Sequence, residues 1–249
     1  MPDLQHRYLG SRRFIMTALN ARSLHANIGN IQADQNILQS NLIFVQETWA
    51  NETDPDNHYT IPGFTMSRKD NTMLAFEQRP HRGIIAYHRE CTFTITHTEK
   101  HSSCDIMCTT VTTPLLALNV VAVYRSPQLA MKDFLLLMAS GMQTLPPANP
   151  CIILADFNVD IKGMSPDTAL KLALQDADHH LKCLVQFMME HKLSQMVTAP
   201  TVDSGMQIDH LWTDVPSRLN HMDSEAFVLE TFYSDYRPIG LQVRAPAEA

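Results

Sequence analysis

The residues of this chain that best suit chemistry are acids, amides and a phenol at or next to the ends of short apolar runs. They are Asn20, Glu47, Tyr124, Asp156, Asn158, Asp209 and Asp235. Carboxylate and amide oxygens without supporting cysteines suit Mg²⁺ or Mn²⁺ better than zinc. A divalent cation with few carboxylates and neutral amides is typical of phosphoryl chemistry. The metal withdraws charge from the phosphate, and the amides donate to its oxygens without adding charge.

Any one of these residues, taken alone, is more typical of ordinary turn chemistry. A single Asp after a strand is usually a turn residue or a helix cap. The complete set is harder to attribute to turns, because strand ends at one edge of packed sheets can converge and rigid strands support a site well. The sequence therefore predicts that these side chains meet at one edge of a sheet structure.

Runs rich in Val, Ile, Thr and Phe are expected to form the strands that position these side chains. They cover residues 14–19, 42–47, 83–88, 91–97, 105–111, 115–124, 151–156, 206–212, 225–232 and 239–244. Apolar residues at helical spacing predict helices over 24–39, 127–143 and 165–193. This pattern predicts an α+β fold, a four-layer α/β/β/α sandwich of two packed, mostly antiparallel sheets flanked by helices. We expect one domain over 13–244, after a flexible segment at 1–12.

Composition and charge restrict the classes of protein to which the chain can belong. It has 249 residues, 45% of them hydrophobic, and a net charge of −7. No run of eighteen apolar residues predicts a membrane span. The five cysteines and the lack of an export signal predict an intracellular chain with reduced thiols. The negative charge disfavours affinity based on broad phosphate neutralisation, but it suits an acidic cleft that holds a divalent metal.

Six short motifs carry a resemblance to a known family. They are LNARSL (19–24), FVQETW (44–49), AVYRSP (122–127), ILADFNVD (153–160), QIDHLW (207–212) and SDYRPI (234–239). Their order resembles that of the endonuclease/exonuclease/phosphatase superfamily, which includes DNase I-like and apurinic endonuclease-like enzymes. The NARSL and VYRSP segments are most similar to the endonuclease domains of non-LTR retrotransposons and related mobile elements. The resemblance covers roughly residues 13–244.

The resemblance implies a role for each matching residue in metal-assisted hydrolysis of a phosphodiester. Glu47 would be the main ligand of Mg²⁺ or Mn²⁺, with Asn20 and Asp235 at the metal site. Asp156 would position or activate the attacking water, and Asp209 would orient a catalytic histidine. The scissile phosphate would be contacted by Tyr124, Asn158 and Arg125. It further implies a monomeric domain acting on the DNA backbone, away from membranes and, for genomic DNA, in the nucleus.

The chain departs from the family pattern at Tyr236, where the family's last motif has histidine. An ordinary tyrosine has a pKa of about 10, so near neutral pH it donates hydrogen bonds well but accepts protons poorly. Either activity is lost or severely weakened, or Tyr236 donates to the phosphate while Asp156 or the metal handles the water. His210 is a poor substitute, because neighbouring strand residues point to opposite faces. Arg22 replaces a second acid of apurinic endonuclease-like members, which disfavours abasic-site repair.

The sequence leaves three functions open. They are a Mg²⁺-dependent DNA endonuclease, an inactive nucleic-acid-binding or interaction module on the same fold, and a phosphatase or phosphodiesterase for a small molecule or lipid. The retroelement-like segments favour the first over the third, and Tyr236 is the main argument for the second. A zinc site made by His97, His101, Cys104 and Cys108 is disfavoured, because alternating strand residues cannot all converge.

Overall fold

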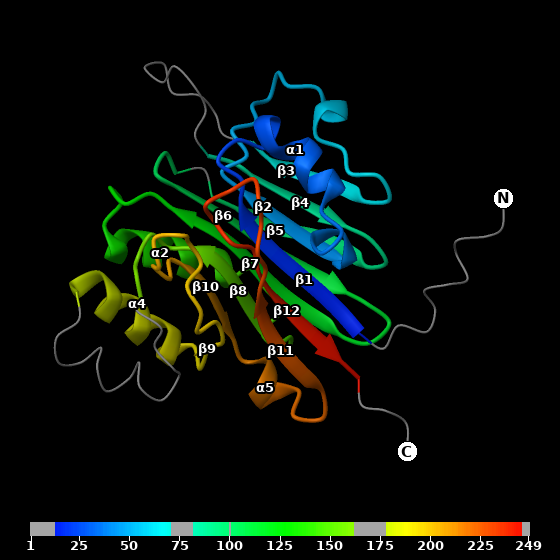
Figure 1. Cartoon of the computed structure of the whole chain (residues 1–249). Coiled ribbons are helices and arrows are strands. Elements are labelled where there is room, and N and C mark those ends of the chain that lie inside the picture. Colours follow the sequence, from blue (N-terminus) through cyan, green and yellow to red (C-terminus); the bar gives the residue numbers. More distant parts are fainter. Residues whose placement is uncertain (1–12, 71–81, 100, 162–177, 246–249) are drawn as a thin grey trace.

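The computed structural model describes residues 13–70, 82–99, 101–161 and 178–245, which form two packed six-stranded sheets with helices outside them (Figure 1). The first sheet has the spatial order β11 (Asp223–Val228), β12 (Ile239–Arg244), β1 (Arg13–Asn20), β2 (Leu42–Gln46), β4 (Ile84–His88) and β3 (Thr65–Lys69). The second has the order β5 (Thr92–Thr98), β6 (Cys104–Thr112), β7 (Ala117–Arg125), β8 (Cys151–Asp156), β10 (Asp209–Thr213) and β9 (Ser194–Gln195).

Each sheet is antiparallel except for one central parallel pair, β1 with β2 and β7 with β8. A parallel pair needs a crossover connection, and helices supply it here. Helix α1 (Leu24–Ala33) connects β1 to β2, and α2 (Met131–Met142) connects β7 to β8. The other helices in the described ranges are α4 (His179–Glu190), the short α5 (Val215–Arg218) and the single 3₁₀ turns η2 (Ile37–Gln39) and η3 (Asp56–His58).

Alternating side chains along the central strands build three separate apolar cores. In β2, Leu42 and Phe44 pack between the two sheets, whereas Ile43 and Val45 pack beneath α1. This division follows from the two-residue period of a strand, whose successive side chains point to opposite faces. A strand buried on both faces reads as a continuous apolar run, which is why β2 and β8 were predictable.

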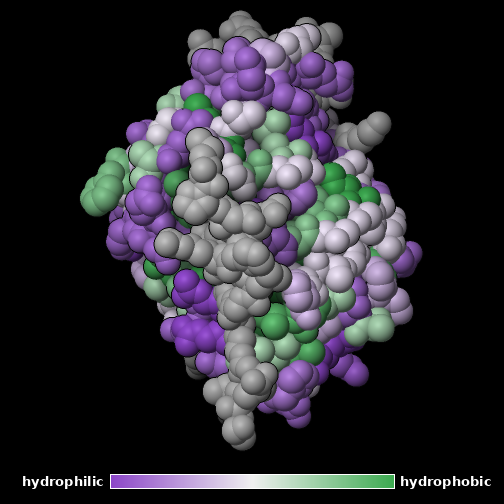
Figure 2. Space-filling view, turned by 90° about the vertical axis from the view of Figure 1, so that its right-hand side faces the viewer, coloured by the Kyte–Doolittle hydropathy of each residue, from purple (hydrophilic) through white to green (hydrophobic). Residues whose placement is uncertain are grey.

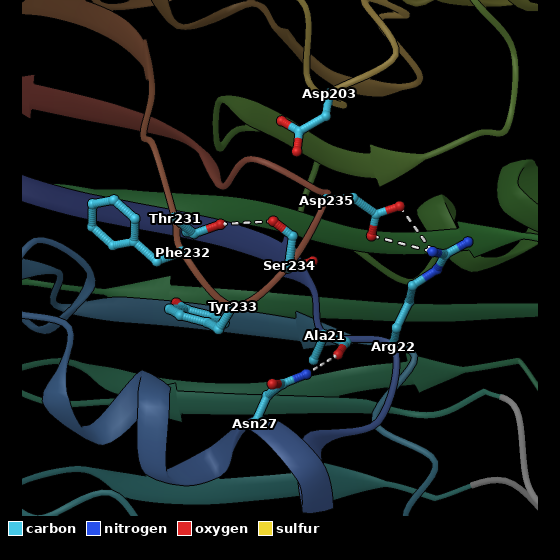
Figure 3. A pocket seen from close by; sticks show the side chains of 9 residues that line it. All are labelled: Ala21, Arg22, Asn27, Asp203, Thr231, Phe232, Tyr233, Ser234 and Asp235. Atoms are coloured by element: carbon cyan, nitrogen blue, oxygen red, sulfur yellow. Dashed lines mark hydrogen bonds and ion pairs between the residues drawn. The ribbon is translucent and has the colours of Figure 1, made fainter.

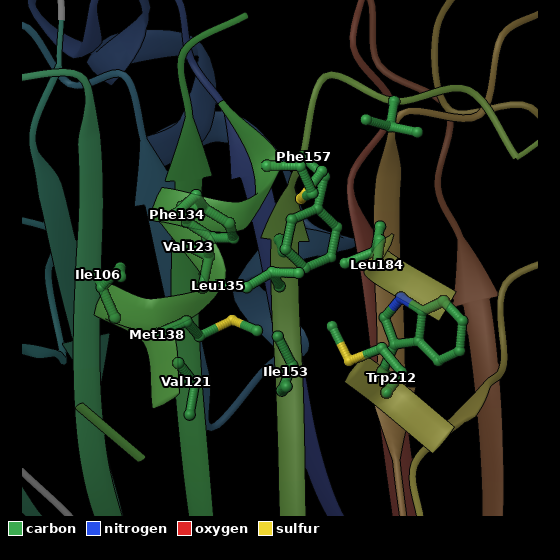
Figure 4. Close-up of a cluster of buried hydrophobic side chains, with 14 of the residues drawn as sticks. Ile106, Val121, Val123, Phe134, Leu135, Met138, Ile153, Phe157, Leu184 and Trp212 are labelled. Carbon is green, nitrogen blue, oxygen red and sulfur yellow. The ribbon is translucent and has the colours of Figure 1, made fainter. Parts of the chain in front are cut away.

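The third core lies between the second sheet and the helices α2 and α4 (Figure 4). Val121 and Ile153 point out of the sheet toward Phe134 and Met138 of α2. The succession of helix, sheet, sheet and helix, separated by three apolar cores, confirms the predicted four-layer α/β/β/α sandwich.

Several predicted element bounds are wrong. The helix predicted over 24–39 ends at Ala33, because Asp34 turns into an extended conformation and its carboxylate accepts the N–H groups of Asn36 and Ile37. The helix predicted from 127 begins at Met131, and the strand predicted over 225–232 ends at Val228. The predicted helix 165–193 is observed as α4, but its first part, like the flexible segment 1–12, lies outside the described residues.

The edge strand β3 was not predicted at all. Its sequence, Thr-Met-Ser-Arg-Lys, has little apolar character, and β4 is its single partner among the strands that the structure describes. A strand at a sheet edge needs little apolar surface, so its sequence carries a weak signal.

One face of the molecule, seen in Figure 2, is mixed in character. On the side where β1 begins and β12 ends, hydrophilic and hydrophobic residues are interspersed (Figure 2). No helix in the described part of the chain is long and apolar enough to cross a bilayer.

Candidate active site

The two parallel strand pairs bring their carboxyl ends to the same edge of the sandwich. In the first sheet Asn20 ends β1 beside Gln46, and Glu47 follows directly. In the second sheet Tyr124 lies in register with Asp156 at the end of β8. The Asn20 amide nitrogen donates to Asp156 Oδ2 across the sheets at 3.0 Å. Asn20 and Asp156, two of the residues that were predicted to converge, are therefore in contact across the sheets.

A buried amide joins the sheets directly beneath this edge. Gln46 Nε2 donates to the carbonyl oxygens of Val123 at 2.7 Å and Leu154 at 3.2 Å, both in the second sheet. Gln46 is 1% exposed, so these bonds are shielded from water. Sequence reasoning missed this residue, although it stands next to Glu47 within the motif FVQETW. Its bonds fix the spacing between the two halves of the site.

Glu47 leaves the sheet with a left-handed backbone conformation, at a φ of 48°. For a residue with a side chain this conformation is uncommon, and it is concentrated at functional sites. Burial raises the pKa of the Glu47 carboxyl, while hydrogen bonds from Asn20 and Tyr124 and the charge of Arg22 act in the opposite direction. The chain thus holds a half-buried carboxylate next to two neutral donors and within reach of one cation.

Asp156 is fully buried at the centre of the cluster. Its Oδ1 accepts the N–H of Asn158 at 2.9 Å, and its Oδ2 accepts from Asn20. Burial raises the pKa of Asp156 to about 7, with a further contribution from Glu47, although these hydrogen bonds lower it. A carboxyl of this kind is suited to exchange a proton near neutral pH.

Asp209 lies opposite Asp156 in the ladder between β8 and β10. The strand predicted over 206–212 begins only at Asp209, and because β10 runs antiparallel to β8 its start lies at the same edge. Burial and the neighbouring Asp156 raise the pKa of Asp209 well above its usual value, and a hydrogen bond to Thr201 lowers it. Within the described residues Asp209 Oδ2 is buried without a hydrogen-bond partner.

Tyr236 occupies the place of the expected histidine but does not bond to Asp209. Its side chain is 8% exposed and packs with Val202 and Ile208. Burial and the charge of Asp156 raise the pKa of the Tyr236 phenol, so the hydroxyl stays protonated at neutral pH. The unpartnered oxygen of Asp209 agrees with the absence of the histidine that Asp209 was predicted to orient, and that role stays a prediction.

Asp235 stands at the rim of the cluster rather than inside it. Its carboxylate forms an ion pair with Arg22, 2.9 Å from Nη1 to Oδ2, with both side chains about half exposed. The two residues line a shallow cavity of about 380 Å³ together with Asn27, Phe232 and Tyr233 (Figure 3). The metal-site role of Asp235 stays a prediction.

Two other predicted phosphate contacts, Asn158 and Arg125, are tied to each other. Asn158 has a φ of 52°, and its side-chain nitrogen donates to the Arg125 carbonyl at 2.8 Å. The Arg125 guanidinium is 2% exposed and donates to the carbonyls of Leu129 at 3.1 Å and Phe157 at 2.6 Å. Arg125 therefore braces the loop after β8, and its contact with phosphate stays a prediction.

The histidine and the two cysteines of the alternative constellations lie in the core on the outer face of the second sheet, not among the acids of the site. His210 is buried in the outer core, where Nε2 lies 2.9 Å from the Val159 carbonyl, and burial lowers its pKa to about 4. Cys104 and Cys108 pack in the same core. Among the described His, Cys, Asp and Glu residues, no group of three or more is placed to hold a metal ion together.

The donors present nevertheless fit a magnesium ion. Mg²⁺ keeps several waters and commonly needs only one or two protein carboxylates, with substrate phosphate completing its coordination. Glu47 can supply one carboxylate, beside Asn20. The half-buried Glu47 raises the pKa of the buried Asp156, and both raise the pKa of the buried Asp209, one oxygen of which lacks a partner among the described residues. The cluster therefore has a deficit of positive charge.

Comparison with known proteins agrees with this architecture. The endonuclease domain of TRAS1, a telomere-specific non-LTR retrotransposon, superposes with a TM-score of 0.65 at 13% identity, covering 93% of this chain and 98% of that one. The AP endonuclease LMAP from Leishmania major gives 0.67 at 13% identity, covering 94% and 89%. The 3′ phosphatase NExo from Neisseria, bound to a product DNA hairpin, gives 0.61 at 15% identity, covering 92% and 98%.

These identities are low, so the superpositions establish the fold alone, and no curated protein matches the sequence. A family model matches directly, over residues 17–235, which contain all seven polar residues at strand ends. The chain belongs to the endonuclease/exonuclease/phosphatase family, whose fold is DNase I-like.

Proposed function

We propose that this chain is a divalent-metal-dependent DNA endonuclease domain of mobile-element origin, which nicks a strand by hydrolysing a phosphodiester bond. The observation that carries the proposal is the meeting of Asn20, Glu47, Tyr124 and Asp156 from two sheets at one edge, with the register partner Asp209 beside them. The similarity to nuclease folds supports it. Acting on genomic DNA would place the protein in the nucleus.

The residues divide the chemistry among them. Glu47, with Asn20, would hold Mg²⁺ or Mn²⁺, which when bound supplies Lewis-acid polarisation of a phosphate oxygen. Asp156 would accept a proton from the attacking water, because its pKa of about 7 matches that task. Tyr124 and Asn158 would donate to phosphate oxygens. Donors fixed in place before the reaction stabilise the negative charge on the phosphoryl oxygens in the transition state.

A second function has a specific observation in its favour. Asp209 Oδ2 has no partner among the described residues, and Tyr236 supplies no base. An inactive nucleic-acid-binding module on the same fold would have this arrangement. A phosphatase acting on a smaller phosphoester is the third function, since a structural neighbour is named as a 3′ phosphatase.

A plasmid-nicking assay with Mg²⁺ or Mn²⁺ separates these functions. We expect the native chain to convert supercoiled DNA to the nicked form, and Glu47→Ala to abolish the conversion. A positioned acid or base typically contributes up to about 10²–10⁴-fold, and Tyr236→His would add one beside Asp156, so this variant should nick faster than the native chain. Nicking by Tyr236→His alone would establish the inactive module, and hydrolysis of only a small phosphoester by both forms would establish the phosphatase.

A further inference from the structure

Arg22 is held at the candidate site by an unusually constrained loop. Arg22 and Ser23 both have left-handed backbone conformations, with φ values of 42° and 95°. Such residues cost roughly 1–3 kcal/mol each and persist where the surroundings fix them. The Arg22 N–H donates to Asn20 Oδ1 at 3.0 Å, and the Ser23 N–H donates to the Glu47 carbonyl at 2.9 Å. The loop is thus fixed to two residues of the proposed metal site.

The side chain of Arg22 lies over the residue that replaces the expected histidine. Its guanidinium carbon is 5.2 Å from the centre of the Tyr236 ring, within the range of a cation–π contact. Nη1 donates to both carboxylate oxygens of Asp235, at 2.9 and 3.2 Å (Figure 3). The ring and the carboxylate therefore fix the guanidinium from two sides.

The guanidinium keeps free donors. An arginine has five N–H groups, and within the described part of the chain the Nε and Nη2 groups of Arg22 make no hydrogen bond. The side chain is 54% exposed, so these groups face solvent. Its positive charge acts on the Glu47 carboxylate and lowers the pKa of that group.

The other cations near this edge are already engaged. The buried Arg125 guanidinium donates to backbone carbonyls. Arg237, on the same loop as Asp235, lies 3.4 Å from both Asp203 and Glu230. Arg22 is consequently the best-placed described cation for a substrate anion at this site.

We propose that Arg22 contacts the scissile phosphate and supplies the positive charge that the missing histidine would have supplied, with Tyr236 as its platform and Asp235 as its anchor. This inference rests on the proposed function. Arginine presents a planar, permanently charged fork that matches phosphate oxygens, and such a residue can stabilise the charge of a phosphoryl transition state. Arg22 then compensates for the loss of the histidine at position 236, and we call Arg22 and Tyr236 a compensated pair.

The proposed hydrolysis accounts for every bond and proton. The water oxygen forms the new bond to phosphorus, and the proton of that water passes to Asp156. The bridging bond between phosphorus and the leaving oxygen breaks, and the leaving oxygen takes a proton from solvent. Arg22 exchanges no proton, because its guanidinium remains protonated at every working pH.

The test is a double-mutant cycle of Arg22→Gln and Tyr236→His, with Arg22→Lys as the conservative variant and Arg244→Gln as the control. Arg244 is a similarly exposed, ion-paired arginine at the opposite end of the first sheet. In the native background we expect Arg22→Gln to lower kcat for nicking about 100-fold, as removal of one charge-stabilising donor does. KM should change little, Arg22→Lys should retain part of the rate, and Arg244→Gln should behave as the native chain.

In the Tyr236→His background the effect of Arg22→Gln should shrink to less than about tenfold, because the imidazole then supplies the charge. The pH–rate profile should gain an ionisation near 6.5, the usual pKa of histidine. Equal losses in both backgrounds, or a native-background loss no larger than that of Arg244→Gln, would overturn the compensated pair.

A binding measurement keeps this inference separate from the proposed function. DNA binding is measured by fluorescence anisotropy at several salt concentrations with Ca²⁺ in place of Mg²⁺. Loss of one phosphate contact should lower the slope of log K against log salt by about one for Arg22→Gln and leave it unchanged for Arg244→Gln. If the native chain fails to nick DNA, the proposed function fails, and an unchanged slope for Arg22→Gln overturns the Arg22 contact on its own.

Discussion

Replacing Asp156 by asparagine should raise the stability of the metal-free protein above that of the native chain at pH 8. At pH 5 this advantage of the variant should be much smaller. The folded-state pKa of Asp156, about 7, lies above the ordinary value of 3.8, so the folded chain binds this proton more tightly than the unfolded chain does. The stabilising contribution is therefore complete below about pH 4 and is lost as the pH rises through 7. Asparagine carries no charge and removes this dependence.

The magnitude follows from the size of the shift. A shift of one pKa unit corresponds to about 1.4 kcal/mol, so the total contribution is on the order of 4 kcal/mol, of which more than half, roughly 2–3 kcal/mol, falls between pH 5 and 8. For a chain of this size, a change of 1 kcal/mol moves Tm by about 2–4 °C. The difference in Tm between Asp156→Asn and the native chain should thus become more positive by roughly 5–10 °C between the two pH values.

The assay is thermal unfolding in EDTA at pH 5 and pH 8, followed by circular dichroism. Comparison with the variant is needed because His210, with a pKa lowered to about 4, contributes the opposite slope, stability that is lost as the pH falls from 6.5 toward 4. This contribution cancels in the difference. Asp223→Asn, at an exposed position of β11, is the matched control and should show no such change. A Tm difference for Asp156→Asn that stays constant from pH 5 to 8 would refute the argument that burial strains this carboxylate.

Three further outcomes are expected. Adding Mg²⁺ at pH 8, at a hundred times its Kd, should stabilise the native chain by about 2.7 kcal/mol and so raise its Tm. Glu47→Gln should lose most of this gain in the same thermal melts. An equal gain in both proteins would show that Glu47 is not the ligand. Gln46→Leu should lower the free energy of unfolding, measured in urea titrations, by roughly 1–3 kcal/mol, because two hydrogen bonds between the sheets are lost. An unchanged free energy of unfolding would show that these hydrogen bonds make no net contribution. Gly240→Ala should lower the free energy of unfolding by roughly 1–3 kcal/mol, because the new Cβ would meet the Phe227 ring and lie 2.5 Å from the Met16 carbonyl oxygen. An unchanged midpoint of urea unfolding would contradict that close approach.

The fold could be predicted from the sequence because its central strands are buried on both faces. Runs such as residues 42–46 and 151–155 are apolar at every or nearly every position, and this signal survives without knowledge of the partners. Polar residues at the strand ends were visible for the same reason, since each interrupts an apolar run. Their convergence followed from the parallel pairs, which place carboxyl ends side by side.

The rest of the site depends on contacts between residues that lie far apart in the sequence. Thr201 Oγ1 accepts the N–H groups of Ile208 and Asp209 and bonds to the Asp209 side chain, yet nothing in its neighbourhood marks it. The guanidinium of Arg125 looked available for phosphate because its backbone carbonyl partners cannot be read from a sequence. The pairing of Arg22 with Tyr236 joins positions more than two hundred residues apart, so only the folded chain reveals it.

The order of strands has a consequence for the newly made chain. The second sheet comes from one continuous stretch, β5 to β10, whereas β12 pairs with β1 from the other end of the sequence. Until a ribosome has released Arg244, β1 lacks its antiparallel neighbour, and the apolar core between the sheets lacks Ile239, Leu241 and Val243. The contact of Asn20 with Asp156 therefore depends on a strand that gains its antiparallel neighbour last, so we expect the candidate site to assemble late in the folding of the domain.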